Sequence, residues 1–528
     1  MSDPVVNLSR ESVADGAQQF RSQVGHISRH SGVYLAGTIF TVALGYLFKV
    51  YLARVLGAEA LGAYALGLTL VGFVGTFNSL GLATSAVRFA AVYRAERNWT
   101  ALRALLWRGI AILVAANILF AAIFLKLGGV VAVRFYHSLL LARYIPWFSA
   151  LMLLGVITTF YERILAGYKE VGRRTLITNF VGSPVMMLLA VLLIKLGWGL
   201  RGYLLAQVTG AVLVAALLLT AVWKFTPGEA KLSFDWPPSL GREVWSFSRA
   251  AMGLVLLQFL MSQVDKIALG FYRGARDVGI YSISAALVAY VSLILNSVNQ
   301  VFSPMIADLH AKKDHAMLGR LYQALTKWIL GMTLPLAITV MFFARPLLGM
   351  FGHDFEIGGP VLIIGTAGQL VNCGVGSVGM LLLMSGNQKR LLRVQMTMAV
   401  VMTVASIALV PVWGIVGAAV AAAIANAGTN AWNLLEVRRT LGLSPFSRSY
   451  LRLLGPAVVT TLVTLGLRKE AAVFRHGWLA IGISLLASYL VFAIVVAALG
   501  LDADDRLVAG ALWSRVRRFV PAMEGLEP

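Results

Sequence analysis

Apolar stretches recur along this chain from Gly32 to Leu499, and each has the roughly 20 residues that a helix needs to cross a bilayer. Short Arg-rich or Gly/Pro-containing segments separate them. With 59% hydrophobic and 13% charged residues, the chain lies outside the composition range of soluble globular proteins. The sequence therefore predicts an all-α polytopic membrane protein of about 14 transmembrane helices.

The predicted spans are 32–53, 61–82, 104–125, 145–166, 176–196, 202–223, 246–271, 280–302, 325–345, 359–384, 393–413, 414–435, 451–468 and 477–499. The polar leader 1–31 lacks the apolar core of a signal peptide, so we expect the first span to be its own insertion signal.

The formal charge of +22 is spread between the spans instead of gathering on one soluble domain, which argues against a nucleic-acid partner. If the N-terminus is cytoplasmic, most of the 45 Lys and Arg fall on that side. The long basic connections are 88–108, 162–174 and 224–249. This asymmetry predicts a multi-pass protein of the cell inner (plasma) membrane with both termini in the cytoplasm.

The chemical motifs of enzymes and pumps are absent from the sequence. It contains no HExxH, GxSxG or GxxxxGK[ST], the signatures of common hydrolases and ATP-driven pumps. Cys373 is the single cysteine, so one chain cannot form a disulfide or a thiolate metal cluster. The longest outer connection, 126–144, is short for the catalytic loop of a membrane glycosyltransferase or polymerase. We expect a transporter that is not an enzyme and has no cofactor or metal.

The two halves of the chain contain an internal repeat. Gly57–Tyr64 matches Gly274–Tyr281 at an offset of 217, and Trp198–Gly202 matches Trp413–Gly417 at an offset of 215. Two landmarks in the same order are unusual by chance, although Gly and Tyr are common at helix starts and turns. Six spans per copy make this a parallel repeat, with the substrate path expected between the halves.

The repeat predicts the domain organisation. The predicted units are a cytoplasmic segment 1–31, an N-lobe 32–235 with spans one to six, a C-lobe 236–440 with spans seven to twelve, spans thirteen and fourteen in 441–500, and a cytoplasmic tail 501–528.

Three segments carry a family resemblance. They are Ala53–Gly57 with the following Gly62–Tyr64, Gln263–Gly270 leading into Gly279–Tyr281, and Leu381–Asn387 after the tenth span. On these segments the chain resembles the polysaccharide flippase branch of the multidrug/oligosaccharidyl-lipid/polysaccharide (MOP, MATE-like) exporter superfamily, which includes the Wzx-type transporters. The resemblance covers residues 30–440.

The resemblance implies two MATE-like lobes that open alternately to each side. It also implies outward movement of an undecaprenyl-diphosphate-linked oligosaccharide, in the presence of membrane lipids and of the polysaccharide polymerase and glycosyltransferases of the same pathway. The number of spans is similar to that of lipid II flippases, in which two extra helices form a groove for the lipid tail. The arginine pattern of that subfamily's first span is not matched here.

Two lysines inside predicted spans are candidate cargo ligands. Lys49 in span one and Lys266 in span seven differ by 217, so they occupy equivalent positions of the repeat. Ionisable groups within spans usually face a cavity, and two ammonium groups across a cleft suit a diphosphate. The alternative is that each long side chain carries its charge to the nearby membrane interface. Both interpretations stay open.

Asp265 is a candidate for ion coupling. It precedes Lys266, but adjacent helical residues point in different directions and do not form a pair. Asp265 can bind a coupling proton or cation, or it can neutralise a basic residue of an adjacent helix. We favour the second, structural role.

Polar residues of span two and the end of span four are further cavity candidates. Asn78, Gly81, Ser85 and Arg88 follow helical spacing, which predicts a polar stripe that faces the cleft. Arg88, like Arg163, also lies at a cytoplasmic helix end, where topology alone requires a basic residue.

Amides of spans eight and ten complete the candidate set. Asn296 and Asn299 lie in span eight, and Gln369 and Asn372 lie in span ten. Amides at these spacings can bind the hydroxyl groups of sugars. They can equally join helices through interhelical hydrogen bonds.

These observations favour a flippase for lipid-linked glycans over three alternatives. A cation-coupled multidrug exporter of the same superfamily would be expected to have a carboxylate in its first span, whereas 33–52 has no acid and contains Lys49. A membrane enzyme of glycan assembly lacks the outer loop it would need. A scaffold without transport stays open, although polar stripes within spans argue against it.

Overall fold

The structure of this protein, a computed structural model, describes residues 43–231, 239–471 and 477–500. These residues are almost wholly helical and include no strand, which confirms the all-α fold class. The predicted leader 1–31 and tail 501–528 lie outside the described residues.

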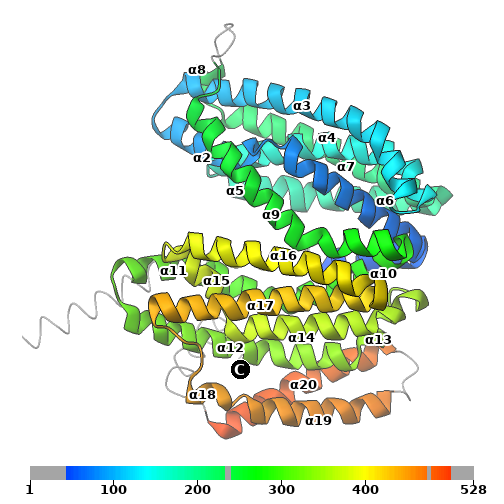
Figure 1. Ribbon diagram of the computed structural model, residues 1–528, viewed down its shortest axis with the longest axis vertical. Coiled ribbons are helices and arrows are strands. Elements are labelled where there is room, and N and C mark those ends of the chain that lie inside the picture. The colour runs from blue at the N-terminus through cyan, green and yellow to red at the C-terminus, as the bar shows by residue number, and fades with distance from the viewer. Residues whose placement is uncertain (1–42, 232–238, 472–476, 501–528) are drawn as a thin grey trace, which may run out of the picture.

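The first described helix, Ala43–Asn78, has no label in Figure 1. The N-terminal half continues with α2 (Leu82–Ala95), α3 (Trp99–Arg134), α4 (Leu139–Gly167), α5 (Val171–Thr175), η1 (Leu176–Gly182), α6 (Ser183–Leu193), η2 (Ile194–Trp198), α7 (Gly199–Phe225) and α8 (Gly228–Lys231). The C-terminal half contains α9 (Arg242–Arg273), α10 (Ala275–Val291), α11 (Leu293–Ala311), α12 (His315–Phe342), α13 (Ala344–Gly349), η3 (His353–Gly358), α14 (Gly359–Val375), α15 (Val378–Met384), α16 (Gln388–Trp413), α17 (Ile415–Leu441), α18 (Arg448–Leu451), α19 (Leu454–Ala471) and α20 (Gly477–Leu499).

The helices form two lobes that lie one above the other in Figure 1. The upper N-lobe contains α2 to α7, and the lower C-lobe contains α10 to α17. Between them, α9 packs against α2 of the N-lobe and against α16 and α17 of the C-lobe. The helices α19 and α20 pack against each other and against α12, at the far edge of the C-lobe. The exact boundaries of the lobes stay predictions.

Among the described residues, eleven helices are long and apolar enough to cross a membrane, or twelve if the bent pair α10 and α11 is one span. Two of the eleven, Ala43–Asn78 and Val171–Phe225, have 36 and 55 residues, although about 20 suffice for a bilayer. Gly57 in the first and Gly197 in the second have positive φ, which bends the chain where the sequence predicts a turn. Each therefore holds two spans, so the predicted number of about fourteen agrees with the structure.

Side-chain contacts show that both long segments fold back on themselves. Phe48 and Tyr64, on either side of the first turn, both lie against the ring of Tyr203, with centroid distances of 6.1 and 4.9 Å. In the second segment, α6 packs antiparallel to α7 through glycines: a Cβ at Gly202 would lie 3.0 Å from that of Leu193. Small residues at such crossings let membrane helices approach closely.

The eighth span, predicted at 280–302, is bent. The segments Ala275–Val291 and Leu293–Gln300 meet at an angle of 48° around Ser292. The N-lobe copy is interrupted a few residues from the equivalent position: residues 79–81 separate the helix Ala43–Asn78 from α2, and Gly81 has a φ of +66°. This span is therefore interrupted in both lobes, at nearby positions of the repeat.

The tenth span, predicted at 359–384, is broken at Gly376, which has a φ of +69°. Tyr322 donates a hydrogen bond of 2.8 Å to the carbonyl oxygen of Val375, and Tyr450 donates one of 2.7 Å to that of Gly374. These hydroxyl groups satisfy carbonyl groups next to the break, as a helix interruption at membrane depth requires.

The buried apolar cores distinguish the two ends of the bundle. At the end where Gly57 and Gly274 turn, a single core contains residues of both lobes, such as Leu66 and Ile280. At the opposite end each lobe has a core of its own, around Phe160 in the N-lobe and around Tyr322 in the C-lobe. We call these the joined end and the divided end.

At the joined end the two copies of the repeat motif contact each other directly. A Cβ at Gly62 would lie 1.6 Å from the carbonyl oxygen of Ala275, and a Cβ at Gly279 would lie 1.9 Å from that of Ala58. Gly279 and Ala275 are the repeat equivalents of Gly62 and Ala58. The contact is therefore reciprocal, and glycine at both positions lets the backbones meet.

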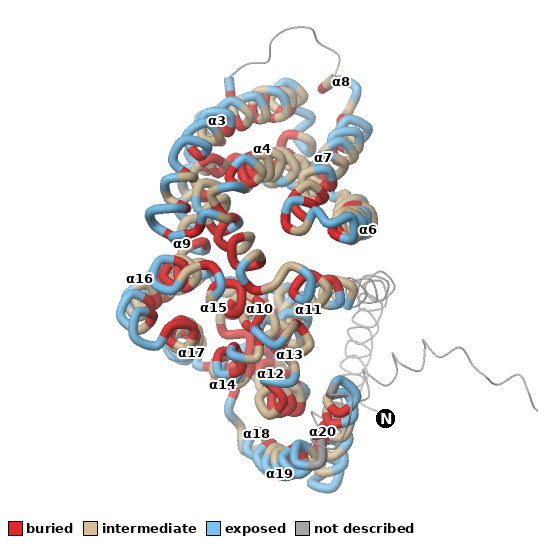
Figure 2. Tube along the Cα trace, turned by 90° about the vertical axis from the view of Figure 1, so that its right-hand side faces the viewer, coloured by how far each residue is buried: buried red, intermediate tan, exposed pale blue. Residues whose placement is uncertain are grey.

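The outer faces of the helices are apolar and exposed. Leu119 in α3, Leu188 in α6, Leu462 in α19 and Ile494 in α20 each expose more than half of their surface. Figure 2 shows exposed residues along the outward faces of these helices and buried ones toward the interior. An exposed apolar surface of this extent indicates lipid as the solvent, so this is a multi-pass membrane protein.

Hydroxyl groups attach the C-terminal helix pair to the C-lobe. Thr339 of α12 donates to Ser488 of α20 at 3.1 Å, and the Ser488 Oγ lies 2.9 Å from Thr464 Oγ1 of α19. All three side chains are buried. Interhelical hydrogen bonds of this kind hold membrane helices together, so the pair is attached to the C-lobe through α12.

Candidate functional site

A cavity of about 370 Å³ lies between the lobes, next to the joined end. The first described helix, α7, α9 and α10 contribute its lining. The remaining wall is aliphatic, and no carboxylate lines the cavity among the described residues. Its polar lining consists of Lys49, Tyr64, Tyr203, Gln263, Lys266 and Ser282.

Lys49 and Lys266 line this one cavity, the N-lobe contributing the first and α9 the second. The Lys49 Nζ lies 5.7 Å from the centroid of the Tyr290 ring, which belongs to α10, so its side chain reaches the opposite lobe. The Lys266 Nζ donates a hydrogen bond of 3.0 Å to the Gln263 Oε1. Two ammonium groups in a space without an acid favour an anionic ligand.

The packing of neighbouring residues aims both lysines at the cavity. On the first helix, Phe48 and Leu52 are buried in the core of the joined end. On α9, Ala268 and Leu269 belong to the same core. Leu52 and Leu269 each follow a lysine by three residues and so lie on its face of the helix. Each lysine therefore lies at the edge of the core, where the cavity begins.

Asp265 points away from the cavity and is buried. The Tyr281 hydroxyl donates to its Oδ2 at 2.5 Å, and the backbone N–H of Lys266 donates to its Oδ1 at 2.8 Å. These partners join α9 to α10 without a cation. The partner on the adjacent helix is a tyrosine and not the basic residue of the structural role that we favoured. Both roles of Asp265 stay predictions.

The polar stripe of span two does not line the cavity. Asn78 is fully buried and donates to the Asn117 Oδ1 of α3 at 2.5 Å, inside the N-lobe. The Ser85 Oγ lies 2.5 Å from the Ser248 Oγ of α9. Arg88 is exposed, with its guanidinium carbon 4.9 Å from the centroid of the Phe247 ring. Helical spacing identified a shared face, but α3 and α9 cover much of it.

The remaining candidates also lie outside this cavity. Arg163 is exposed near the end of α4. Asn296 is exposed on α11, where its Nδ2 lies 3.5 Å from the Ser292 Oγ. Gln369 accepts a hydrogen bond of 3.0 Å from Asn372 on the same helix, α14.

Asn299 has a buried Oδ1 without a hydrogen-bond partner. Such an atom is costly to leave unpaired, so Asn299 remains a candidate contact for a polar group of the cargo. The assignments of all these residues to cargo binding stay predictions.

The structure adds an aromatic pair that sequence reasoning missed. The Nε2 of Gln207 in α7 donates to the hydroxyl oxygens of Tyr64 and Tyr203, both at 2.7 Å. The two rings lie 4.9 Å apart and line the cavity. A signal was present, because Tyr64 ends the first copy of the repeat motif and directly follows its glycine–alanine pair.

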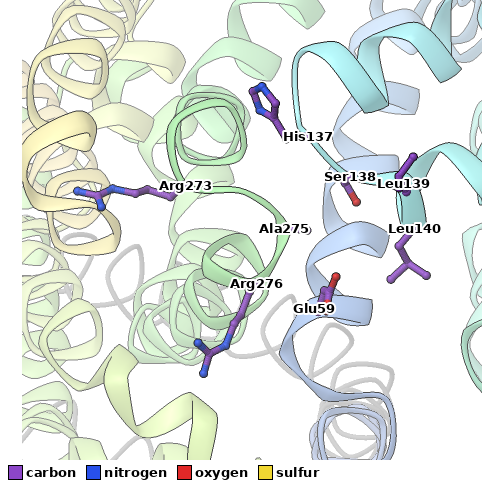
Figure 3. Close-up of a pocket in the computed structure, with 8 residues that line it drawn as sticks. All are labelled: Glu59, His137, Ser138, Leu139, Leu140, Arg273, Ala275 and Arg276. Atoms are coloured by element: carbon purple, nitrogen blue, oxygen red, sulfur yellow. The ribbon is translucent and has the colours of Figure 1, made fainter.

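A second pocket of about 370 Å³ opens at the joined end, between the lobes (Figure 3). Its charged lining includes Glu59 of the N-lobe, and Arg273 and Arg276 of the C-lobe. The two arginine side chains point away from Glu59. Arg276 pairs with Asp354 at 3.0 Å, and Arg273 donates to the carbonyl oxygen of Pro411 at 2.8 Å. We therefore treat this pocket as part of the seam between the lobes.

The sequence matches two families. Residues 27–310 match the family described as polysaccharide biosynthesis protein, and residues 250–420 match the MatE family. No curated protein is similar enough in sequence to match.

Several solved structures share the fold. The lipid II flippase MurJ in an inward closed conformation has a TM-score of 0.70 and 14% identity, over 91% of this chain and 99% of MurJ. An inward-facing multidrug resistance MATE transporter of the MOP superfamily has a TM-score of 0.62 and 14% identity, over 75% and 94%. An outward-facing MATE transporter of the same superfamily has a TM-score of 0.54 and 16% identity, over 76% of this chain and 93% of that transporter. At these identities the likeness shows the fold alone.

Proposed function

Because the chain belongs to the polysaccharide biosynthesis protein family and has the fold of MOP-superfamily transporters, we propose that it flips an undecaprenyl-diphosphate-linked oligosaccharide or polysaccharide repeat unit. The cargo crosses the inner membrane for cell-surface polysaccharide biosynthesis. The partners in this proposal are membrane lipids and the polymerase and glycosyltransferases of the same pathway.

The observation that carries the proposal is the pair of lysines in a cavity that no carboxylate of the described residues lines. Phosphate oxygens accept charge-assisted hydrogen bonds from ammonium groups, which are stronger than neutral ones. Lys49 and Lys266 bind the diphosphate from both lobes, while the hydroxyl groups of Tyr64 and Tyr203 contact the first sugar. The lipid tail stays in the bilayer, next to the C-terminal helix pair.

Alternating access follows from the difference between the two ends. With both termini in the cytoplasm, as the distribution of Lys and Arg predicts, the joined end faces outward. Arg88 and Arg163, near the divided end, attract the diphosphate from the cytoplasmic side. Rocking of 32–235 against 236–440 then parts the joined end and exposes the headgroup to the outside.

The runner-up is a cation-coupled multidrug exporter, which the MatE match of residues 250–420 favours. A lipophilic cation would be repelled by the two ammonium groups, and the cavity offers it no carboxylate. Lys49 and Lys266 therefore favour the anionic cargo.

Depletion of the protein tests the two functions against each other. We expect undecaprenyl-diphosphate-linked oligosaccharide to accumulate in the cytoplasmic leaflet, as measured by leaflet-specific labelling and mass spectrometry. Unchanged lipid-linked glycan together with new sensitivity to cationic drugs would replace the flippase with the exporter.

The double variant Lys49→Gln with Lys266→Gln tests the site. Loss of two charge-assisted hydrogen bonds, each worth about 1.5–3 kcal/mol, should lower flipping more than about 10-fold. The matched control replaces Lys126 and Lys195, two exposed lysines that do not line the cavity. Normal flipping by the cavity variant, at equal amounts of membrane-inserted protein, would remove the lysine pair from the mechanism.

A further inference from the structure

One amide connects the cargo cavity to the contact between the lobes. The Gln263 Oε1 accepts hydrogen bonds from the Lys266 ammonium at 3.0 Å and from the Thr69 hydroxyl at 3.2 Å. Gln263 and Lys266 belong to α9, whereas Thr69 belongs to the N-lobe helix Ala43–Asn78. Gln263 lines the cavity, and Thr69 is buried behind it, only 2% exposed.

Lys266 depends on such a partner for its position. A lysine side chain has four rotatable bonds, so its ammonium is fixed in space only where a second group holds it. Gln263 lies three residues earlier on α9, on the same face of the helix. An amide oxygen has two lone pairs, and here Lys266 and Thr69 use both.

The N-lobe lacks the equivalent arrangement. The repeat counterpart of Gln263 is Tyr46, whose hydroxyl lies 3.9 Å from the Met350 sulfur, a weak acceptor. Lys49 has the Tyr290 ring at 5.7 Å in place of an amide. The two lysines thus share their place in the repeat but differ in what fixes them.

We propose that Gln263 is a positioning residue that makes anion binding by Lys266 depend on contact between the lobes. The inference rests on the proposed function and deepens it. While the lobes meet, Thr69 holds Gln263, and Gln263 holds the ammonium in the cavity. When the lobes part, Gln263 loses Thr69 and turns freely, so Lys266 loses its fixed position. The diphosphate is then bound less tightly and is released.

Diphosphate binding and contact between the lobes are thermodynamically linked, which has a second consequence. Because contact between the lobes strengthens diphosphate binding, bound diphosphate must strengthen the contact by the same factor. The gain in affinity for diphosphate is limited, because Thr69 has a single hydroxyl proton. It shares this proton between Gln263 and the carbonyl oxygen of Ala65, which lies at 2.9 Å. We therefore expect the lower part of the range of a neutral hydrogen bond, about 2- to 5-fold in affinity.

The experiment measures binding of undecaprenyl diphosphate to the full-length protein in nanodiscs. Thr69→Val should weaken binding about 2- to 5-fold, although Thr69 does not touch the cavity, and Thr69→Ser should restore it. Thr76→Val is the matched control, because Thr76 is a buried threonine of the same helix that donates to the Phe73 carbonyl oxygen within that helix.

A double-mutant cycle separates positioning from a general structural effect. In the Lys266→Gln background, Thr69→Val should change binding no further. The inference is overturned if Thr69→Val binds like Thr76→Val, or if its effect keeps its full size without Lys266. Wild-type protein that fails to bind undecaprenyl diphosphate at all overturns the proposed function, and this inference with it.

Discussion

The joined end and the divided end of the bundle differ in the chemistry of their contacts. At the joined end, Gly62 and Gly279 let backbones meet, and both lobes share one apolar core. At the divided end, the contact runs through the start of α9, where Ser248 lies against Ser85 and Glu243 accepts a hydrogen bond of 3.1 Å from Tyr93. The first contact is made mainly by backbone and apolar side chains, and the second by polar side chains.

This difference predicts which end of the bundle opens when the lobes separate. The joined contact is mainly apolar, although the Arg54 Nε donates a hydrogen bond of 2.7 Å across it to the carbonyl oxygen of Met350. The two surfaces can therefore separate as units once such bonds break. The start of α9 is built into the N-lobe, because Val244 belongs to the N-lobe core. The end of α9 packs on α16 of the C-lobe. We expect the joined end to open while α9 stays attached to the N-lobe at the divided end.

The largest expected effect on flipping comes from a bulkier side chain at the contact of the joined end. Gly62→Val places a side chain where even a Cβ would lie 1.6 Å from a backbone oxygen, so the lobes cannot meet. We expect flipping to fall more than about 10-fold, since a full cycle needs the closed contact. A thiol introduced at Ser282, in the cavity, should become accessible to an impermeant reagent from outside.

Gly129→Val is the control for this prediction. Gly129 lies in the membrane helix α3 and has nothing within 4 Å of its Cβ position, so the same substitution there should leave flipping unchanged. Equal flipping by the Gly62 and Gly129 variants would contradict the assignment of the joined end as a moving contact.

A smaller effect is expected inside the N-lobe, which should move as one body. Asn78→Ala leaves the Asn117 Oδ1 without its donor in a fully buried place. The free energy of unfolding should fall by about 1–3 kcal/mol, with flipping per folded molecule unchanged. Reversible unfolding in detergent measures the first quantity and reconstituted vesicles the second. The control is Asn179→Ala, at an exposed position. Lost flipping in a stable variant would place Asn78 in the transport mechanism.

The smallest effect is expected from a disulfide at the divided end. The Oγ atoms of Ser85 and Ser248 lie 2.5 Å apart, close enough for the pair Ser85→Cys with Ser248→Cys to form a bond of about 2.05 Å. Because the native Cys373 is buried, it should not form a disulfide with either introduced cysteine. Flipping should stay within about twofold of the reduced protein. A loss on oxidation that a reductant reverses would show that α9 must leave α2 during transport.

Much of the fold could be predicted because its signals are local. Lipid as solvent imposes apolar stretches of a set length, and the turns at Gly57 and Gly274 repeat a short motif. The offset of that motif also relates Lys49 to Lys266, which is why one cavity could be expected to contain both.

The other site residues depend on long-range packing, which the spacing along one helix does not encode. The stripe that includes Asn78 identifies a face of a helix, but α3 covers Asn78 through Asn117. Gln263 stood in a family motif, yet its role depends on Thr69, nearly two hundred residues earlier in the chain. The break at Gly376 likewise depends on the hydroxyl of Tyr450, supplied from outside the repeat.

The reciprocal contact at the joined end also bears on how the two halves of the chain arose. Gly62 meets Ala275, and Gly279 meets Ala58, so each half presents the same two positions to the other. This is the geometry of an isologous interface, in which residue i of one copy touches residue j of the other and the reverse. A half-length protein with this motif would have presented both sides of this contact, so a symmetric dimer of such a protein could form the same reciprocal pair of contacts before a gene duplication joined the two copies.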